Sequence, residues 1–125
     1  MASSRISDCP ASPNCVSSLA RDRDHYVNPF PMDIAPDAAW EALKRALAAE
    51  PGIRIAEEDK ERGYLRAEAT SRIFRFVDDV AFQLVAEERL IHVRSASRVG
   101  YWDLGVNRRR VERLREALRR EGLWR

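Results

Sequence analysis

Four consecutive strand-like segments, joined by short polar turns, constrain the fold of this chain more than any other feature. They cover residues 53–56, 64–70, 74–84 and 90–99, and apolar residues recur in them mainly at every second position. Such alternation is typical of strands that bury one face and expose the other. Because strands connected by only a few residues pair with their neighbours in opposite directions, we expect an antiparallel meander.

The position of each residue within these segments predicts which side chains share a face. Side chains at alternate positions of a strand point to the same side of a sheet. In the third segment one face carries Phe74, Phe76, Val80, Phe82 and Leu84, and in the fourth segment one face carries Ile91, Val93 and Val99. We therefore expect these apolar side chains to form the buried face of the sheet.

Two amphipathic helices flank the strands. The first is expected over residues 36–50, where Pro36 suits the first helical position because its missing N–H would be unpaired there. The second is expected from Asp103, as N-cap, to about residue 120, with Gly105 inside its first turn. Its apolar stripe contains Leu104, Val111, Leu114 and Leu118. The sequence therefore predicts an α+β fold, an antiparallel meander of four to five strands with both helices packed on one face.

Length and composition indicate a single domain. The chain has 125 residues, which is enough for one hydrophobic core. Residues 1–31 contain four of the six prolines and many serine, asparagine and aspartate residues, so we expect a loop segment that packs on the domain formed by residues 32–125. A short extended piece around residues 25–27 would supply the fifth strand.

Charge and hydropathy set the expected partners and location. The net charge is only +2, because 22 lysine and arginine residues nearly cancel 20 aspartate and glutamate residues. This balance gives no strong signal for nucleic-acid binding. No apolar run approaches the roughly 20 residues that span a bilayer, and Met1 to Ser7 form no apolar leader. We therefore expect a cytoplasmic protein, with partners and oligomeric state open.

Polar side chains gather where the last strand meets the last helix. Ser95 and Ser97 share the predicted core face, whereas Arg94 and Arg98 share the opposite face. Asn107 lies on the apolar stripe of the helix, where a buried amide without hydrogen bonds would cost about 1–3 kcal/mol. These residue types predict a polar network at the junction between strand and helix.

Two adjacent aspartates on the third segment extend this network. Asp78 shares the face of the apolar residues and Asp79 takes the other face, so the two side chains are not expected in one site. If the third and fourth segments pair as a hairpin, Asp79 is expected to meet Arg94 or Arg98 across the sheet. Two interpretations remain open, a structural cluster of ion pairs and a preorganised site for a small anion.

The two cysteines lie in the N-terminal segment, in the stretch CPASPNC. Five residues separate Cys9 from Cys15, so a disulfide and a pair of free thiols are both compatible with the spacing. A Cys-x-x-Cys redox motif is absent. Zinc would need two further ligands, and His25 and His92 are the only histidines. We expect no metal and no cofactor.

Three motifs in order carry a resemblance to a known family. CPASPNCVSS (9–18), AEATSRIFRFVDDVAFQL (67–84) and VRSASRVGYWDLGVNRRRVERLR (93–115) resemble the signature of the domain-of-unknown-function 1499 family. The resemblance implies a mostly bacterial protein with no assigned activity and no catalytic residues to carry over. Many relatives carry an N-terminal membrane segment or lipoprotein-like leader, which this sequence lacks. The polar positions that match the family pattern, besides Cys9 and Cys15, include Asp78, Asp79, Arg94, Ser95, Ser97, Arg98, Asp103, Asn107 and Arg108.

Three functional hypotheses follow. In the first, the protein is a non-enzymatic binding or scaffold domain, and its polar centre holds the N-terminal loop or a small anionic ligand. In the second, it is an enzyme that uses Cys15, with His25 as a base, or the cluster of Asp79, Arg94 and Arg98. In the third, it carries an apolar ligand or a lipid in a cavity lined by Trp40, Phe74, Phe76 and Phe82.

Overall fold

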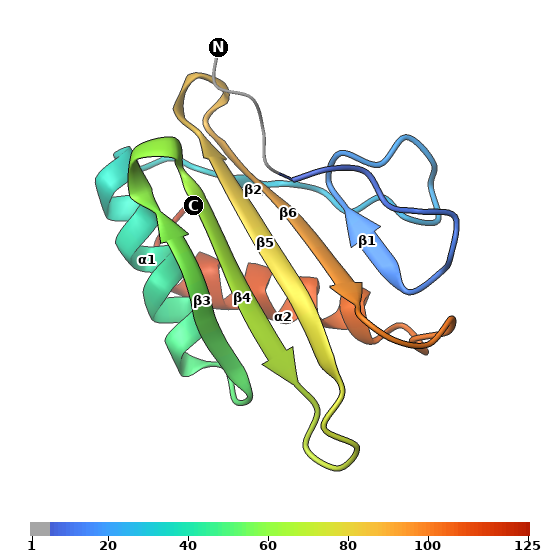
Figure 1. Cartoon of the computed structure of the whole chain (residues 1–125). Helices are drawn as coiled ribbons and strands as arrows, with labels where there is room; N and C mark the ends of the chain where they lie inside the picture. Colours follow the sequence, from blue (N-terminus) through green and yellow to red (C-terminus); the bar gives the residue numbers. More distant parts are fainter. Residues whose placement is uncertain (1–5) are drawn as a thin grey trace.

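The computed structural model describes residues 6–125 as a single twisted sheet covered by two helices (Figure 1). Met1 to Ser7 are expected to form no apolar leader, and residues 1–5 of this stretch lie outside the described residues. Two single turns of 3₁₀-helix, Lys60–Arg62 and Ala86–Glu88, connect neighbouring strands. The main elements in chain order are β1 (Cys15–Ser17), β2 (Phe30–Pro31), α1 (Pro36–Ala49), β3 (Ile53–Asp59), β4 (Tyr64–Thr70), β5 (Val77–Val85), β6 (Leu90–Ser97) and α2 (Val106–Arg120).

The predicted α+β fold is confirmed. The strands run in the order β1-β6-β5-β4-β3, every neighbouring pair is antiparallel, and β2 pairs with β6 farther along the same edge as β1. Figure 1 shows α1 and α2 side by side on one face of this sheet. The meander from β3 to β6 is the one that the spacing of the segments predicts.

The core lies between the sheet and the two helices. Most of the alternate residues of β4, β5 and β6 that point toward the helices are buried, as the pattern predicts, and Leu84 and Ser97 near the strand ends are half-buried. Each large apolar side chain removed from water contributes about 1.5–3 kcal/mol. The largest completely buried side chains include Phe30, Phe82, Leu43, Leu47, Leu65, Ile91, Leu114 and Leu118.

The β4–β5 hairpin corrects part of the core prediction. Residues 71–76 leave the sheet as a tight turn, so Phe74 and Phe76 are 73% and 54% exposed. The turn closes through hydrogen bonds between Ser71 and Phe76, and Arg75 takes a φ of 60°. Because the strand starts only at Val77, the alternate pattern of the preceding residues has no sheet to pack against.

The connection between β6 and α2 is also longer than expected. Pairing with β5 ends at Ser97, so Val99 lies beyond the sheet and is 58% exposed. Leu104 and Gly105 both have positive φ values, 55° and 79°, so α2 begins at Val106 and its N-cap residue is Gly105 rather than the predicted Asp103. The predicted helical stripe is correct from Val111 onward and wrong at Leu104, which is 85% exposed.

The N-terminal segment contains more sheet than its composition predicts. Residues 15–17 form β1 and pair with the outer edge of β6, placing Val16 in the core. The extended piece expected around residues 25–27 contributes an isolated parallel bridge between Tyr26 and Ser17 instead of a strand. Pairing with β6 explains why a stretch rich in proline and serine still has a fixed conformation.

Candidate functional site

Asn107, in the first turn of α2, is the centre of a buried polar network. Its side chain is completely buried. Its Oδ1 accepts hydrogen bonds from Ser95 Oγ (2.7 Å) and Arg110 Nη1 (2.7 Å). Its Nδ2 donates to the backbone oxygen of Asn14 (3.2 Å) and to Ser97 Oγ (3.0 Å). One amide therefore joins the N-terminal segment, the last strand and the last helix.

Asp103 and Asn14 extend the network to the loop before α2. Asp103 Oδ2 accepts a hydrogen bond from Asn107 Nδ2 (2.9 Å), and its Oδ1 accepts one from the backbone N–H of Gly105 (2.8 Å). Burial raises the pKa of the Asp103 carboxyl, but these hydrogen bonds outweigh burial, and the pKa lies below its ordinary value. Asn14 Nδ2 donates to the carbonyl of Gly100 (2.6 Å). The loop is thus fixed at both ends.

A buried ion pair completes the helix-facing cluster. Arg110 Nη2 lies 2.8 Å from Asp78 Oδ2, and both side chains are about nine-tenths buried. Arg110 Nη1 also donates to Ser95 Oγ at 3.2 Å. In the part of the chain that the structure describes, every buried side-chain nitrogen and oxygen has a hydrogen-bond partner. The network is therefore internally satisfied.

A second charged cluster lies on the opposite face of the sheet. Arg98 donates to both carboxylate oxygens of Asp79 at 2.8 Å and to Glu68 Oε2 at 2.7 Å. Arg66 bonds the same two carboxylates, and Arg54 bonds Glu68. The predicted pairing of Asp79 with Arg98 is present, and the alternative pairing with Arg94 is not.

The structure thus divides the predicted polar residues between two faces instead of bringing them into one centre. Asp78, Ser95, Ser97, Asp103 and Asn107 lie on the helix side of the sheet, and Asp79 and Arg98 lie on the outer side. Arg94 donates to the backbone oxygen of Asp8 (3.4 Å), and Arg108 donates to backbone oxygens of the 20–28 loop. Arg110, which is not among the residues predicted for the polar centre, is a central member of the buried network.

The charged cluster on the outer face of the sheet, formed by Arg66, Glu68, Asp79 and Arg98, predicts a specific loss of stability in acid. Hydrogen bonds from Arg98, Arg54 and Arg66 lower the pKa of Glu68 from 4.5 to about 2. A carboxyl with a lowered native pKa stabilises the fold fully above its unfolded pKa, and this stability is lost as the pH falls from about 4.5 towards 2. Urea unfolding between pH 2 and 6 should therefore show a shallower acid dependence in Glu68→Gln than in the wild type. Glu41→Gln, on the exposed side of α1, is the matched control, and an unchanged slope in Glu68→Gln would contradict the prediction.

Cys9 and Cys15 form a disulfide, which resolves the alternative left open by their spacing. Cys15 lies in β1, opposite Ala96 of β6, and is 1% exposed. His25 is engaged elsewhere, with its ring nitrogens at 2.6 Å from Asp22 Oδ2 and 2.9 Å from the backbone oxygen of Ser12. The structure therefore does not place a free thiolate beside a histidine base.

Removal of the disulfide should destabilise the protein moderately. The bond closes a loop of seven residues, for which the chain-entropy estimate is about 2 kcal/mol. We expect Cys9→Ser/Cys15→Ser to lower the free energy of unfolding by about this amount and to keep the same fold by circular dichroism. Ser12→Ala, in the same loop, is the control. A loss below about 0.5 kcal/mol would show that the loop is held by its hydrogen bonds alone.

Ser18, His92 and Glu88 form a hydrogen-bonded chain that the sequence analysis did not identify. His92 Nδ1 lies 3.0 Å from Ser18 Oγ, and His92 Nε2 lies 3.0 Å from Glu88 Oε1. The residue types match a serine, histidine and acid series. However, Ser18 is 7% exposed and its Oγ also accepts from the backbone N–H of Val93 (2.9 Å). These contacts fasten the chain after β1 to β6.

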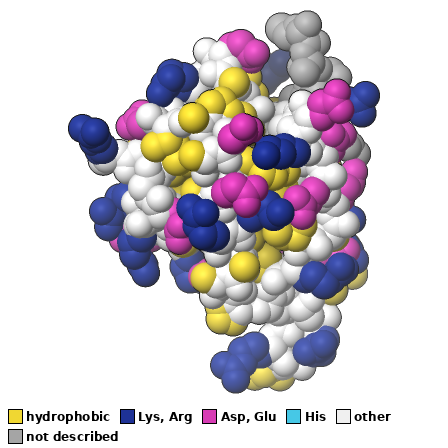
Figure 2. Space-filling model, turned by 90° about the vertical axis from the view of Figure 1, so that its left-hand side faces the viewer, with side chains coloured by type: hydrophobic (Ala, Val, Ile, Leu, Met, Phe, Trp, Pro, Cys, Tyr) yellow, Lys and Arg dark blue, Asp and Glu magenta, His cyan; other side chains and the backbone are white. Residues whose placement is uncertain are grey.

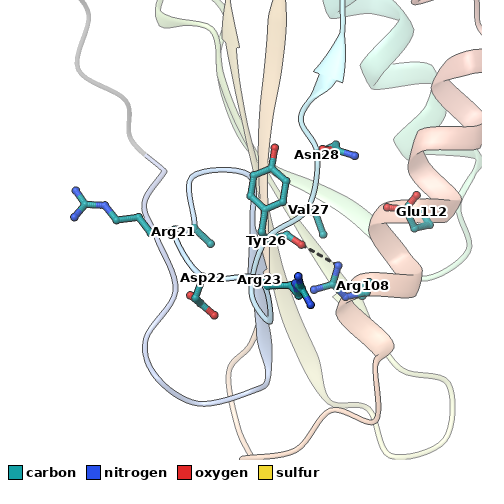
Figure 3. Close-up of a pocket in the computed structure, with 9 residues that line it drawn as sticks. Arg21, Asp22, Arg23, Tyr26, Val27, Asn28, Arg108 and Glu112 are labelled. Carbon is teal, nitrogen blue, oxygen red and sulfur yellow. Dashed lines mark hydrogen bonds between the residues drawn. The ribbon is translucent and has the colours of Figure 1, made fainter.

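An open groove of about 670 Å³ lies between the 20–28 loop and α2 (Figure 3). Arg108 lines it from α2 and donates to the backbone oxygens of Tyr26 and Asp24, both at 2.9 Å. Arg21 and Arg23 have no ion-pair partner among residues 6–125, and in Figure 3 Arg21 points away from α2. The groove therefore combines positive charge with wide exposure to solvent. Asp22 and Glu112 also line it.

The aromatic residues suggested for a lipid cavity do not lie together. Trp40 and Phe82 are buried in the core, whereas Phe74 and Phe76 stack on each other at the exposed tip of the hairpin. Within residues 6–125 no group of three or more histidine, cysteine or acidic side chains is placed to hold a metal ion. The helices of the same residues are too short or too polar to cross a membrane.

The comparisons with known proteins agree with the resemblance of the three motifs. A family model described as "Protein of unknown function (DUF1499)" matches residues 5–118, which covers the disulfide loop, the sheet and nearly all of α2. No curated protein matches the chain. Because the match includes far more than half of the sequence, the chain belongs to the DUF1499 family.

Proposed function

We propose that the protein is a non-enzymatic binding domain, in which the polar centre is a scaffold that holds the loops in place. The observation that carries this proposal is the completeness of the network around Asn107. Its five hydrogen bonds connect the N-terminal segment, β6, the following loop and α2. A site for a ligand usually presents some polar groups whose partners are supplied only by that ligand.

The chemistry of the other candidate groups also favours binding over catalysis. Cys15 is buried in a disulfide, so it offers no nucleophile in this form. Asp79 and Arg98 satisfy each other through two hydrogen bonds of 2.8 Å, and hydrogen bonding to Arg98 lowers the pKa of Asp79. A carboxylate held ionised in this way is a weak general base.

The groove beside α2 supports a second candidate, a domain that binds a small anion. Arg23 and Arg108 line it, and arginine is suited to phosphate and carboxylate groups. Two observations weaken this candidate. Arg108 already donates to two backbone oxygens, and Asp22 and Glu112 add negative charge at the rim. Calorimetric titration with inorganic pyrophosphate, on the wild type and Arg23→Gln, tests it directly.

Native mass spectrometry of protein purified from its own host tests the scaffold. We expect a native mass equal to that of the bare chain. A larger native mass that disappears on denaturation would indicate a bound small molecule and would overturn the scaffold interpretation. The denatured mass without reductant should be lower by two hydrogens because of the disulfide. The cytoplasmic location stays a prediction, and a disulfide retained in the host would weigh against it.

A further inference from the structure

We infer that one end of the sheet docks onto the surface of an anionic phospholipid bilayer, through two exposed loops. This inference rests on the proposed function, because it gives the binding domain its partner. The loops are the β4–β5 hairpin tip, residues 71–76, and the β6–α2 loop, residues 98–105. We call this region the loop end. In Figure 1 the hairpin tip is the lowest part of the molecule, and the β6–α2 loop projects to the right beyond the end of β6; both lie away from the marked N-terminus.

The two loops are neighbours because of the sheet topology. Thr70 pairs with Val77 where the hairpin leaves the sheet, and Asp78 pairs with Ser97 where β6 ends. The backbone N–H of Arg98 also lies 3.4 Å from the oxygen of Val77. The loops therefore leave adjacent strands at the same end and can contact one flat surface together.

Exposed apolar side chains are concentrated at this end. Nine large hydrophobic residues of the described chain are exposed, and all except Tyr26 belong to the two loops or to the first residue of α2. The most exposed are Leu104 (85%), Ile73 (83%), Phe74 (73%) and Trp102 (73%). Such a concentration on a single face marks an interaction site, since scattered apolar residues are the norm for a free surface.

The charge of the loop end suits an anionic surface. Arg72 and Arg75 alternate with the apolar residues of the hairpin tip, which contains no acidic residue. Within residues 6–125 neither arginine has an ion-pair partner. The only acid in the second loop, Asp103, is turned towards Gly105 and Asn107. At the bottom of Figure 2, lysine or arginine side chains flank hydrophobic ones on the tip that is lowest in Figure 1.

The residue types and shape favour a bilayer over a protein partner. Tryptophan and tyrosine are enriched at membrane interfaces, where an apolar ring with a polar group suits the headgroup region. Tyr101 and Trp102 are adjacent, 58% and 73% exposed. The apolar residues belong to two loops, and none of them lines the groove beside α2. Arginines nearby add attraction to anionic headgroups.

The backbone of both tips also holds these side chains outward. Leu104 and Arg75 have φ values of 55° and 60°, a conformation that is unfavourable for residues other than glycine. The conformation of Leu104 directs an apolar side chain into solvent, at 85% exposure, where it contributes nothing to the core. A bilayer would supply the apolar surroundings that the isolated protein lacks.

Vesicle flotation with the full chain tests the inference. The probes are large unilamellar vesicles of phosphatidylcholine alone and of phosphatidylcholine with phosphatidylglycerol. We expect the wild type to partition at least about tenfold more strongly onto the anionic vesicles, and less strongly at high salt. Phe74→Ser/Trp102→Ser should lose about tenfold or more, and Arg72→Gln/Arg75→Gln should lose a similar factor on anionic vesicles only.

Two controls separate the loop end from general effects. Tyr26→Ser removes the exposed aromatic that lies elsewhere, and Arg21→Gln/Arg23→Gln removes the same charge from the groove beside α2. Both should bind vesicles within about twofold of the wild type. No binding to anionic vesicles, or equal losses in the controls, would overturn the inference. The scaffold proposal is tested by the native mass of the purified protein, which does not depend on whether the protein binds vesicles. The two experiments can therefore fail independently, and failure of this inference is distinguishable from failure of the scaffold proposal.

Discussion

Asn107→Ala should lower the free energy of unfolding by about 3 kcal/mol or more, although the substitution is on a helix, where alanine is otherwise favourable. The variant removes five hydrogen bonds and takes one partner each from the buried side chains of Ser95 and Arg110 and from the half-buried side chain of Ser97. Each buried polar group left without a hydrogen-bond partner costs about 1–3 kcal/mol, and rearrangement of neighbouring side chains recovers part of this free energy. Chemical denaturation at neutral pH measures the loss.

The matched control for this substitution is Asn28→Ala. Asn28 is exposed in the loop before β2, and among residues 6–125 only its backbone oxygen is engaged, by Arg115 at 2.7 Å. This control should change stability by no more than about 0.5 kcal/mol. A similar small effect for Asn107→Ala would mean that water replaces the amide, and the network would then not be the scaffold that we propose.

Periodicity predicted the parts of this fold in which burial on one face determines the structure. The alternation in β4 and in β5 from Val80 onward, and the stripe Val111, Leu114 and Leu118 of α2, all follow from packing against a common core. Periodicity fails at Phe74, Val99 and Leu104 for one reason. Phe74 and Val99 continue the apolar pattern of their strands beyond the last residue that pairs in the sheet, and Leu104 continues the helical stripe before the first residue of α2. In all three places the element has ended, so the side chain has no core to pack against.

The grouping of several candidate-site residues was predictable from the sequence, but one central residue was not. Alternation along the strands correctly put Asp78 and Asp79 on opposite faces and Ser95 on the helix side, and the apolar stripe of the helix put Asn107 there too. It could not show that Arg110 reaches back to Asp78, because a long side chain at the edge of a helical stripe can point either way. Nor could local pattern predict β1, whose three residues are strand only because β6 pairs with them.

Arg110→Met should be about as damaging as the loss of Asn107, for an electrostatic reason. The substitution keeps the length and packing of the side chain but leaves the Asp78 carboxylate buried without its partner at 2.8 Å. Breaking a buried ion pair from one side typically costs about 3–5 kcal/mol, because desolvation of the remaining charge is no longer compensated. Arg113→Met, on the same helix, breaks only the exposed pair with Glu50 and should cost about 0–1 kcal/mol.

A double variant separates the charge effect from a packing effect. In Asp78→Asn/Arg110→Met no charge remains at the buried position, so the double variant should be more stable than Arg110→Met alone by at least about 1 kcal/mol. Urea denaturation of the four proteins in the cycle gives the coupling energy directly. If Asp78→Asn instead destabilises further in the Arg110→Met background, the main role of Arg110 is to hold Ser95 and Asn107 through its Nη1 hydrogen bonds. The polar centre would then depend on its neutral hydrogen bonds more than on its ion pair.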